Sequence, residues 1–446
     1  MIAALLAAVV AVSSPMPAAA SAGDVSFTSH GVTLHGTVVT PEGGARGPAI
    51  VMVHGSGEHD RDDYRTEAEA FAKAGITTLI YDKRTEGYSL FERDYSVLAD
   101  DALAAVRTLR SRPGVDPARV GVWGLSEGGW VAPLAASKSE DVAFVVTVGA
   151  NGVSPDRQQA WAFETYLRRG GVTGSMVDMV ASTNMRTLAS AGAFPEAGYD
   201  PVPVLEKVRQ PVLGLWGELD RLTPPGEAVR IFRETLERKG NRQYTLKVFP
   251  QAQHGLRNTT DGFDKLDGYA PGYLDLVGTW VTGLAEGPVQ ASADPPPRQV
   301  SESVALAPLA WYEQPWLQIG VWAVALLAFA AYPVTALFRR RKDVPLARPA
   351  RWLATTGVLA TAGFLAYYIA LTMGAAQAPG PVLFGRTLPW LTLQLIAVGV
   401  VVTAAVTAVS WWRRRNETSP GIRVGLLLAG AVVFVPWAVH WGLLVP

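Results

Sequence analysis

Four long apolar segments without Asp, Glu, Lys or Arg occupy the C-terminal third of the chain, and they constrain its fold more than any other feature. They cover residues 316–338, 352–373, 388–410 and 424–443. Each has about the 20 residues that an α-helix needs to cross the hydrocarbon core of a bilayer. A buried soluble bundle is the alternative, but four uncharged helices of this length leave too little polar surface for water. We therefore expect an all-α region of four transmembrane helices over 311–446.

Basic residues in the connecting loops predict the orientation of these segments. The loop after the first segment contains RRRK at 339–342 and the loop after the third contains RRR at 413–415, whereas the loop between the second and third has a single basic residue, Arg386. Loops rich in lysine and arginine stay on the cytoplasmic side. The first segment then runs inwards, and the preceding residues lie on the extracytoplasmic side of the cell membrane.

The N-terminal residues independently indicate export. A short apolar run at 2–12 is followed by small residues, which predicts a signal peptide over 1–22 with cleavage after Ala20 or Ala22. No basic residue precedes the run, so a retained N-terminal anchor or a misplaced start codon is the alternative. In each case the residues from 23 onwards are expected to be exported.

Length and composition narrow the class of protein. With 446 residues the chain exceeds what one core usually supports, so at least two structural units are expected. Basic and acidic residues both number 39, so no charge excess favours nucleic acid as a partner. The absence of cysteine excludes disulfides, thiolate metal ligands and a cysteine nucleophile.

Residues 23–285 alternate short β-branched runs with longer amphipathic stretches, which is typical of a mostly parallel sheet with flanking helices. The predicted strands are 49–53, 76–81, 120–123, 142–148, 212–216 and 244–249. Residues 152–208 interrupt this rhythm, and we expect them to form a helical cap over a substrate pocket. Residues 286–310 contain three consecutive prolines and little apolar periodicity, which predicts a stiff, extended linker.

A candidate nucleophile, Ser126, lies in the string Gly-Leu-Ser-Glu-Gly at 124–128, after the strand 120–123 and before a predicted helix at 129–137. This is the setting of a nucleophile elbow, whose glycines make room for a sharp turn from strand to helix. The position of this string between strand and helix supports the assignment more than the string alone does.

A serine hydroxyl needs a base to take its proton and an acid to orient that base. Among six histidines, His254 follows the last predicted strand in a short loop. Asp220 follows the strand 212–216 and is our candidate for the acid, with Glu218 as the alternative. The order Ser126, Asp220, His254 is the order of an α/β-hydrolase triad.

Backbone amides are expected to stabilise the oxyanion of the reaction. One should come from Glu127, directly after the nucleophile. The other should come from the turn at 54–57 after the strand 49–53, where we expect the amide of Ser56 to act.

These residues resemble bacterial α/β-hydrolases related to the prolyl oligopeptidase and serine aminopeptidase groups, especially esterases with an H-G-S-G-x-x-D-R-D string. That string is HGSGEHDRD at 54–62, and YDKR at 81–84 and GLSEGG at 124–129 also match. The resemblance covers about 25–285 and implies an α/β-hydrolase fold. Thr85 replaces the usual glycine after YDKR, and the four-segment tail lies outside the family pattern.

These observations predict an extracytoplasmic, membrane-anchored carboxylic-ester hydrolase that works through an acyl-enzyme. A serine peptidase is the nearest alternative, because the same triad cleaves amides, and an acyltransferase is a third. A non-catalytic sensor or transporter is less well supported, since the triad is intact and the spans lack charged groups that a transport path would use. The expected partners are a small-molecule ester or peptide and the lipid bilayer. No metal and no cofactor is predicted.

Overall fold

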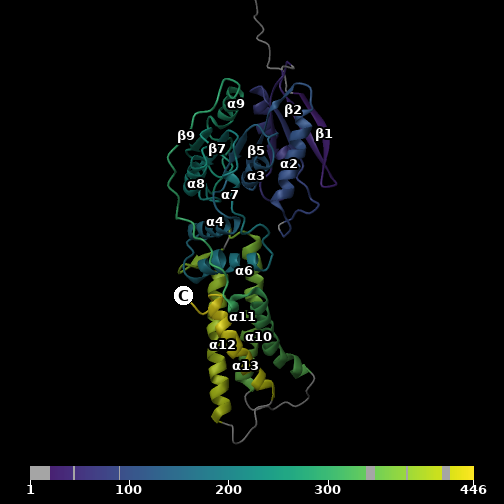
Figure 1. Ribbon diagram of the computed structural model, residues 1–446. Coiled ribbons are helices and arrows are strands. Elements are labelled where there is room, and N and C mark those ends of the chain that lie inside the picture. Colours follow the sequence, from purple (N-terminus) through teal and green to yellow (C-terminus); the bar gives the residue numbers. More distant parts are fainter. Residues whose placement is uncertain (1–20, 44–45, 90, 338–346, 378–379, 414–421) are drawn as a thin grey trace, which may run out of the picture.

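The computed structural model describes residues 21–43, 46–89, 91–337, 347–377, 380–413 and 422–446. They form a sheet domain, a helical cap and a four-helix bundle, stacked in that order (Figure 1). Nearly all of the expected signal peptide at 1–22 lies outside the described residues. The expected cytoplasmic loops at 339–342 and around 414–415 lie outside them as well.

The sheet has nine strands in the order β1-β2-β4-β3-β5-β6-β7-β8-β9. β2 pairs antiparallel with β1 and with β4, and all the other pairs are parallel. The strands are β1 (Ser21–Ser29), β2 (Val32–Thr40), β3 (Gly47–Val53), β4 (Thr77–Tyr81), β5 (Val115–Leu125), β6 (Val145–Val148), β7 (Val212–Gly217), β8 (Tyr244–Phe249) and β9 (Ser292–Ala293).

The central strands are buried on both faces, as parallel strands covered by helices are. Every residue of β4 and β7 is buried. All six predicted strands are present, but β5 begins at residue 115 rather than 120, and β6 begins at 145 rather than 142. The mostly parallel sheet expected from the sequence is therefore confirmed.

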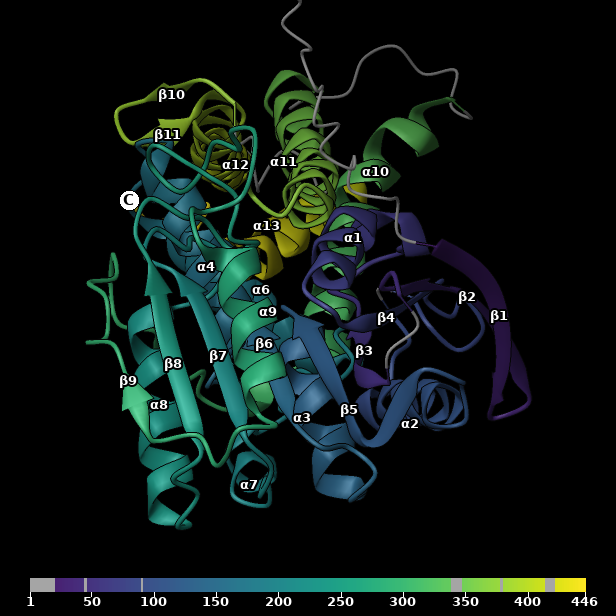
Figure 2. The ribbon, with the colours of Figure 1, turned by 90° about the horizontal axis from the view of Figure 1, so that it is seen from above.

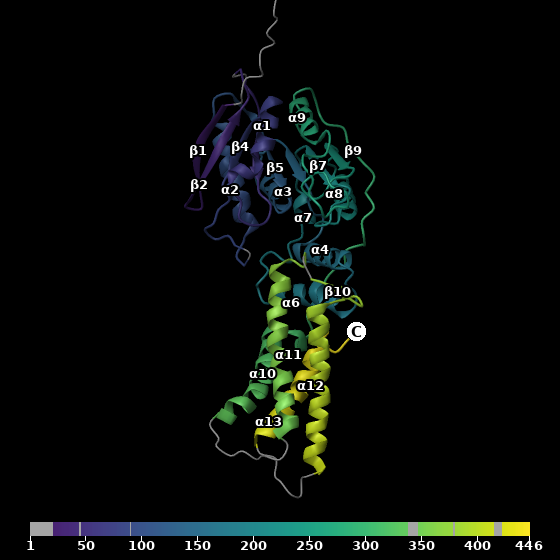
Figure 3. The same ribbon diagram turned by 180° about the vertical axis from the view of Figure 1, so that it is seen from behind.

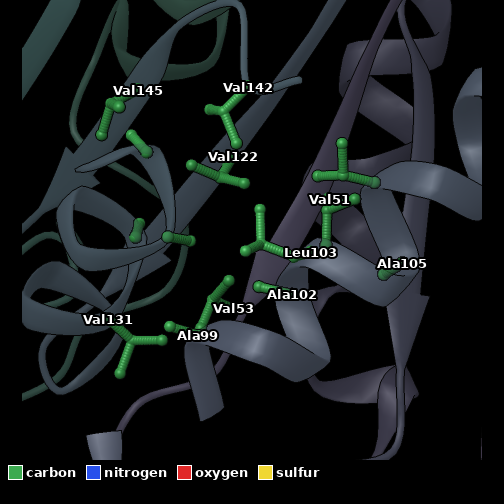
Figure 4. Packing of buried hydrophobic residues seen from close by; sticks show 14 of the residues in the cluster. Val51, Val53, Ala99, Ala102, Leu103, Ala105, Val122, Val131, Val142 and Val145 are labelled. Carbon is green, nitrogen blue, oxygen red and sulfur yellow. The ribbon is translucent and has the colours of Figure 1, made fainter. Parts of the chain in front are cut away.

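Helices cover both faces of the sheet (Figure 2). Successive residues of β3 alternate between two cores: Val51 faces the layer that contains α2, and Ile50 faces the layer that contains α1 and α9. Small alanines at 99 and 102 of α2 let this helix pack closely on Val53 and Val122 (Figure 4). These flanking helices are α1 (Arg65–Lys73), which follows a 3-10 turn (Arg61–Tyr64), α2 (Tyr95–Arg110), α3 (Gly128–Lys138), α8 (Pro225–Arg238) and α9 (Tyr273–Gly283).

The cap is inserted between β6 and β7 and lies between the sheet domain and the bundle (Figure 1 and Figure 3). It shares one apolar core with the bundle, in which Met176 and Phe163 of the cap pack with Trp390 and Phe364. The cap elements are α4 (Pro155–Arg169), α5 (Ser175–Asp178), a π-helix (Met179–Thr183), α6 (Asn184–Ser190) and α7 (Val202–Leu205).

The segment 286–310, predicted to be a stiff linker, is bound to the domain rather than being a free spacer. It supplies β9, which adds to the edge of the sheet beside β8. The Ser303 amide donates to the buried Glu227 carboxylate at 2.6 Å, and the Trp161 indole donates to the Ser301 carbonyl at 2.8 Å. These bonds satisfy polar groups that an isolated linker would leave to water.

The bundle contains four helices that are long and apolar enough to cross a membrane. Large apolar side chains lie on its outer surface, for example Leu327 and Val432, which are 68% and 74% exposed. After a 3-10 turn (Trp311–Glu313) the helices are α10 (Pro315–Leu337), α11 (Ala347–Met373), α12 (Leu388–Arg413) and α13 (Ile422–His440), and a small hairpin of β10 (Val382–Leu383) and β11 (Arg386–Thr387) joins α11 to α12.

Candidate active site

Ser126 occupies the turn between β5 and α3 in a left-handed backbone conformation, with φ of 57°. A positive φ costs a non-glycine residue roughly 1–3 kcal/mol, so surrounding contacts must hold it. The Ser126 amide donates to the Val148 carbonyl at 3.0 Å, and the Gly129 amide donates to the Ser126 carbonyl at 2.8 Å. The serine side chain is thereby presented at the carboxyl edge of the sheet.

Two glycines are required by close packing around this turn. A Cβ at residue 124 would lie 2.0 Å from the Gly128 carbonyl oxygen, and a Cβ at residue 128 would lie 2.5 Å from the Val53 carbonyl oxygen. Neither position can hold a side chain without moving backbone. The glycines of the motif therefore have the steric role expected for an elbow.

His254 and Asp220 come from the loops after β8 and β7 and are in contact. His254 Nδ1 lies 2.8 Å from Asp220 Oδ2, and both residues are buried. The aspartate also accepts hydrogen bonds from the amides of Leu222 and Thr223 and from the Thr223 hydroxyl. Glu218, the alternative acid, is exposed at the surface. The structure thus brings Asp220, and not Glu218, to the imidazole.

His254 and Ser126 line the same cavity. Within the described part of the chain, His254 Nε2 is buried and has no hydrogen-bond partner, so no bond joins it to the serine hydroxyl. Catalytic hydrogen bonds often form only when substrate is bound. Gly149 packs against the imidazole: a Cβ there would lie 2.8 Å from Nδ1, a constraint that the sequence analysis missed.

Two amides of the turn at 54–57 bind tyrosine hydroxyls. The Gly55 amide donates to the Tyr64 hydroxyl and the Gly57 amide donates to the Tyr88 hydroxyl. Among the described residues, the amides of Ser56 and Glu127 have no hydrogen-bond acceptor. These are the two amides expected at an oxyanion site.

The cavity that contains Ser126 and His254 has a volume of about 510 Å³. Ser56, His59 and Arg93 contribute polar groups to its lining. The cap and the end of α11 contribute mostly apolar residues, which include Phe163, Met185, Leu188, Phe194, Met373 and Ala375.

Residues 63–269 match the family model described as the prolyl oligopeptidase family, and the matched part contains Ser126, Asp220 and His254. The same residues lie on a mostly parallel sheet with helices on both faces and a strained serine after β5. The chain contains an α/β-hydrolase domain. The fold class expected from the sequence is thereby confirmed, together with an all-helical C-terminal region of four apolar helices.

The hydrolase domain has relatives of several named activities. Thiohydrolase aneE of Aspergillus aculeatus is 36% identical over 130 residues, which are 28% of this chain and 40% of the relative. Esterase EstD of Thermotoga maritima is 33% identical over 128 residues, 26% of this chain and 31% of the relative. A solved structure, that of the Pyrobaculum calidifontis esterase, is 18% identical to this chain with a TM-score of 0.42. The match covers 60% of this chain and 87% of the esterase chain. The chain matches less than half the length of these curated relatives.

A buried charge cluster behind the serine was not predicted from the sequence. The Glu127 side chain is 1% exposed, and its carboxylate lies 2.7 Å from Lys83 Nζ and 2.8 Å from Arg93 Nη1. The Tyr88 hydroxyl also donates to this carboxylate. Burial lowers the pKa of Lys83 to about 8, against the attraction of Glu127. The cluster joins the turn that carries Ser126 to the loop that carries Lys83. In the sequence, the YDKR string that contains Lys83 was the one signal that could have indicated this contact.

Among the residues that the structure describes, no group of three or more His, Asp and Glu side chains could hold a metal ion.

Proposed function

We propose that this protein is a membrane-anchored serine hydrolase that cleaves carboxylic esters, with Ser126 as nucleophile, His254 as base and Asp220 as its orienting acid. One observation carries the proposal: a strained serine and an aspartate-bound histidine lie on one cavity. The relatives named as an esterase and a thiohydrolase agree with acyl chemistry of this kind.

In the proposed reaction, Ser126 Oγ forms a bond to the carbonyl carbon while its proton passes to His254 Nε2. The amides of Ser56 and Glu127 hold the negative oxygen. Collapse breaks the bond to the leaving group, which takes the proton from Nε2. Water then attacks the acyl-serine, gives a proton to His254 and releases the acid as the serine regains its own proton.

The cavity favours an ester over the substrate of an aminopeptidase. Such a peptidase must hold a substrate ammonium group, which calls for an available carboxylate. Among the described residues that line the cavity, Glu127 is the one carboxylate, and it is already paired with Lys83 and Arg93. Peptidase activity remains the second candidate, because the matching family model is that of the prolyl oligopeptidases.

The exposed apolar surface of the bundle supports an anchoring role. Side chains such as Leu327 would face water in a soluble protein, and a bilayer removes this cost. Basic residues lie at the end of the bundle away from the hydrolase domain, at the start of α11 (Arg348, Arg351), at the end of α12 (Arg413) and near the start of α13 (Arg423). By the positive-inside rule, this supports a hydrolase domain on the extracytoplasmic side.

Hydrolysis of p-nitrophenyl acetate and of an aminoacyl p-nitroanilide by the full-length protein tests the proposal. Ser126→Ala should abolish ester turnover, and Asp220→Asn should lower kcat at least 10²-fold through loss of imidazole orientation, by analogy with other triads. The matched control, Glu218→Gln, alters an exposed acid two residues away and should stay within twofold. Ester turnover that survives Ser126→Ala would refute the assignment, and faster amide than ester turnover would favour the peptidase.

A further inference from the structure

The candidate catalytic cavity extends from the serine to the membrane region. Ser126 and His254 line it, and so do Thr372 and Met373, the last residues of the second span. Met373 is also 61% exposed, so the wall that it forms is accessible from outside the protein. One continuous space therefore connects the reactive groups with the end of α11.

The cap holds this connection in place through bonds to the bundle. Asn184 of α6 is buried, and its amide lies 3.3 Å from the Thr372 hydroxyl and accepts from the Tyr368 hydroxyl at 2.5 Å. The Ser175 hydroxyl lies within hydrogen-bond distance of the carbonyls of Gly442 and Val445, at 2.9 and 2.8 Å. The cap is thus hydrogen-bonded to the bundle as well as being connected to the sheet domain.

Exposed aromatic side chains mark the same end of the bundle. Trp316 lies in the first turn of α10 and is 73% exposed, and Phe384 in the β10–β11 hairpin is 80% exposed. Indole rings favour the boundary between lipid and water. Met373 ends the neighbouring helix α11, so the cavity reaches the protein surface at about the level of the lipid headgroups.

Most of the cap residues that line this cavity are apolar. Phe163 of α4, Leu188 of α6 and Phe194 beyond it are among them, whereas Gln158 and Gln159 of α4 are polar. A water-soluble ester gains little from such walls, whereas a hydrocarbon chain is stabilised in proportion to the apolar surface that it buries. A volume of about 510 Å³ lies in the range of sites that enclose ligands of drug size.

We infer that the substrate is a membrane-resident amphiphile whose acyl chain enters past Met373 and whose ester or thioester reaches Ser126 farther along the same cavity. This inference rests on the proposed function and adds the substrate class. The leaflet that faces the hydrolase domain supplies the substrate.

The test uses the full-length protein in phosphatidylcholine vesicles and two esters with the same leaving group, p-nitrophenyl acetate in water and p-nitrophenyl palmitate in the bilayer. Met373→Arg places a charge at the membrane end of the cavity and should lower the ratio of palmitate to acetate turnover at least tenfold. Leu266→Arg places the same charge at an exposed leucine outside the cavity and should leave the ratio within twofold. Leu188→Glu changes a cap residue that lines the cavity and should also lower the ratio of palmitate to acetate turnover. It serves as the test variant if Met373→Arg does not fold.

The outcomes separate the two proposals. Acetate turnover that depends on Ser126, with a ratio unchanged in Met373→Arg and Leu188→Glu, would overturn the membrane substrate and leave the hydrolase assignment standing. No turnover of either ester above that of Ser126→Ala would overturn the proposed function and this inference with it.

Discussion

Directly behind the candidate nucleophile, two cations and one carboxylate are enclosed by protein. The side chains of Lys83, Arg93 and Glu127 are 4%, 7% and 1% exposed. The cluster carries a net positive charge, and it lies next to the turn whose amides we assign to the oxyanion. In a site of low dielectric constant, a fixed positive charge beside a developing oxyanion stabilises the transition state more than it would in water.

Because the cluster has two cations and one carboxylate, we expect substitutions of its members to lower the free energy of unfolding by different amounts. Glu127→Gln leaves Lys83 and Arg93 buried without their carboxylate, and such uncompensated charge typically costs about 3–5 kcal/mol. Lys83→Met leaves the Arg93–Glu127 pair intact and should cost at least about 1 kcal/mol less. Thermal unfolding of both variants, followed by circular dichroism, gives the comparison. Equal losses of stability would contradict the proposed charge balance.

His54, at the start of the turn that carries Ser56, gives a pH-dependent prediction. Burial lowers its pKa from 6.5 to about 3. Between these values the unfolded chain binds a proton that the folded protein does not, so stability is fully present above pH 6.5 and falls as the pH drops towards 3. At pH 4.5 the loss from this group is roughly 2.7 kcal/mol.

The measurement is the slope of unfolding free energy against pH from 7 to 4.5. His54→Gln should flatten it, whereas His35→Gln, at an exposed histidine of β2, should leave it as in the wild type. If the slope for His54→Gln equals that of the wild type, a group other than His54 causes the pH dependence of stability.

Among the structural elements, the cap is the part whose position determines the shape of the cavity. Its core is shared with the bundle, and Asn184 is a buried polar contact between them. Asn184→Ala removes both bonds and leaves the Tyr368 hydroxyl without its acceptor, at a cost of about 1–2 kcal/mol. Thr187, in the same helix, bonds back to the Thr183 carbonyl instead and provides the matched control, Thr187→Ala.

Hydrogen exchange tests this contact. Asn184→Ala should speed amide exchange in 175–190 by roughly 5–30-fold, the factor that corresponds to 1–2 kcal/mol, and Thr187→Ala should change it little. Equal exchange in the two variants would show that apolar packing alone holds the cap.

The sequence predicted the elements of the sheet better than the contacts between distant segments. The strand before Ser126 and the loops of Asp220 and His254 follow from β-branched runs that end in turn residues, so their meeting at one sheet edge was predictable. The Lys83–Glu127 pair joins residues 44 positions apart, and the Asn184–Thr372 bond joins residues 188 apart. No local pattern encodes such pairs, because they depend on how whole layers pack. The same holds for the segment 286–310, whose proline content indicated extension but not its pairing with β8.

At the scale of the whole molecule, the length of the bundle helices matches the thickness of a bilayer. Met373 at the cavity and Arg351 near the other end of α11 are separated by about 33 Å of helix, close to the roughly 30 Å of the hydrocarbon core. Exposed tryptophans lie at both ends, Trp316 beside the hydrolase domain and Trp352 near Arg351. In the proposed membrane orientation, one end of the cavity would lie at the lipid surface.

Single cysteines can test the predicted sidedness, because the chain has no cysteine of its own. Ser111→Cys, on the exposed end of α2 in the hydrolase domain, should react with a membrane-impermeant maleimide on intact protoplasts. Ser419→Cys, between the third and fourth spans, should react only after permeabilisation. The reverse pattern would place the hydrolase domain in the cytoplasm.

The most direct test of the proposed nucleophile is labelling of the full-length membrane protein with a fluorophosphonate probe, which reports an activated serine without knowledge of the substrate. We expect the wild type and a His35→Ala control to be labelled, Ser126→Ala to be unlabelled, and His254→Ala to be labelled at least tenfold more slowly, because the hydroxyl then lacks its base. Labelling of the wild type that persists in Ser126→Ala, or a folded wild type that the probe does not label, would contradict the proposed serine hydrolase.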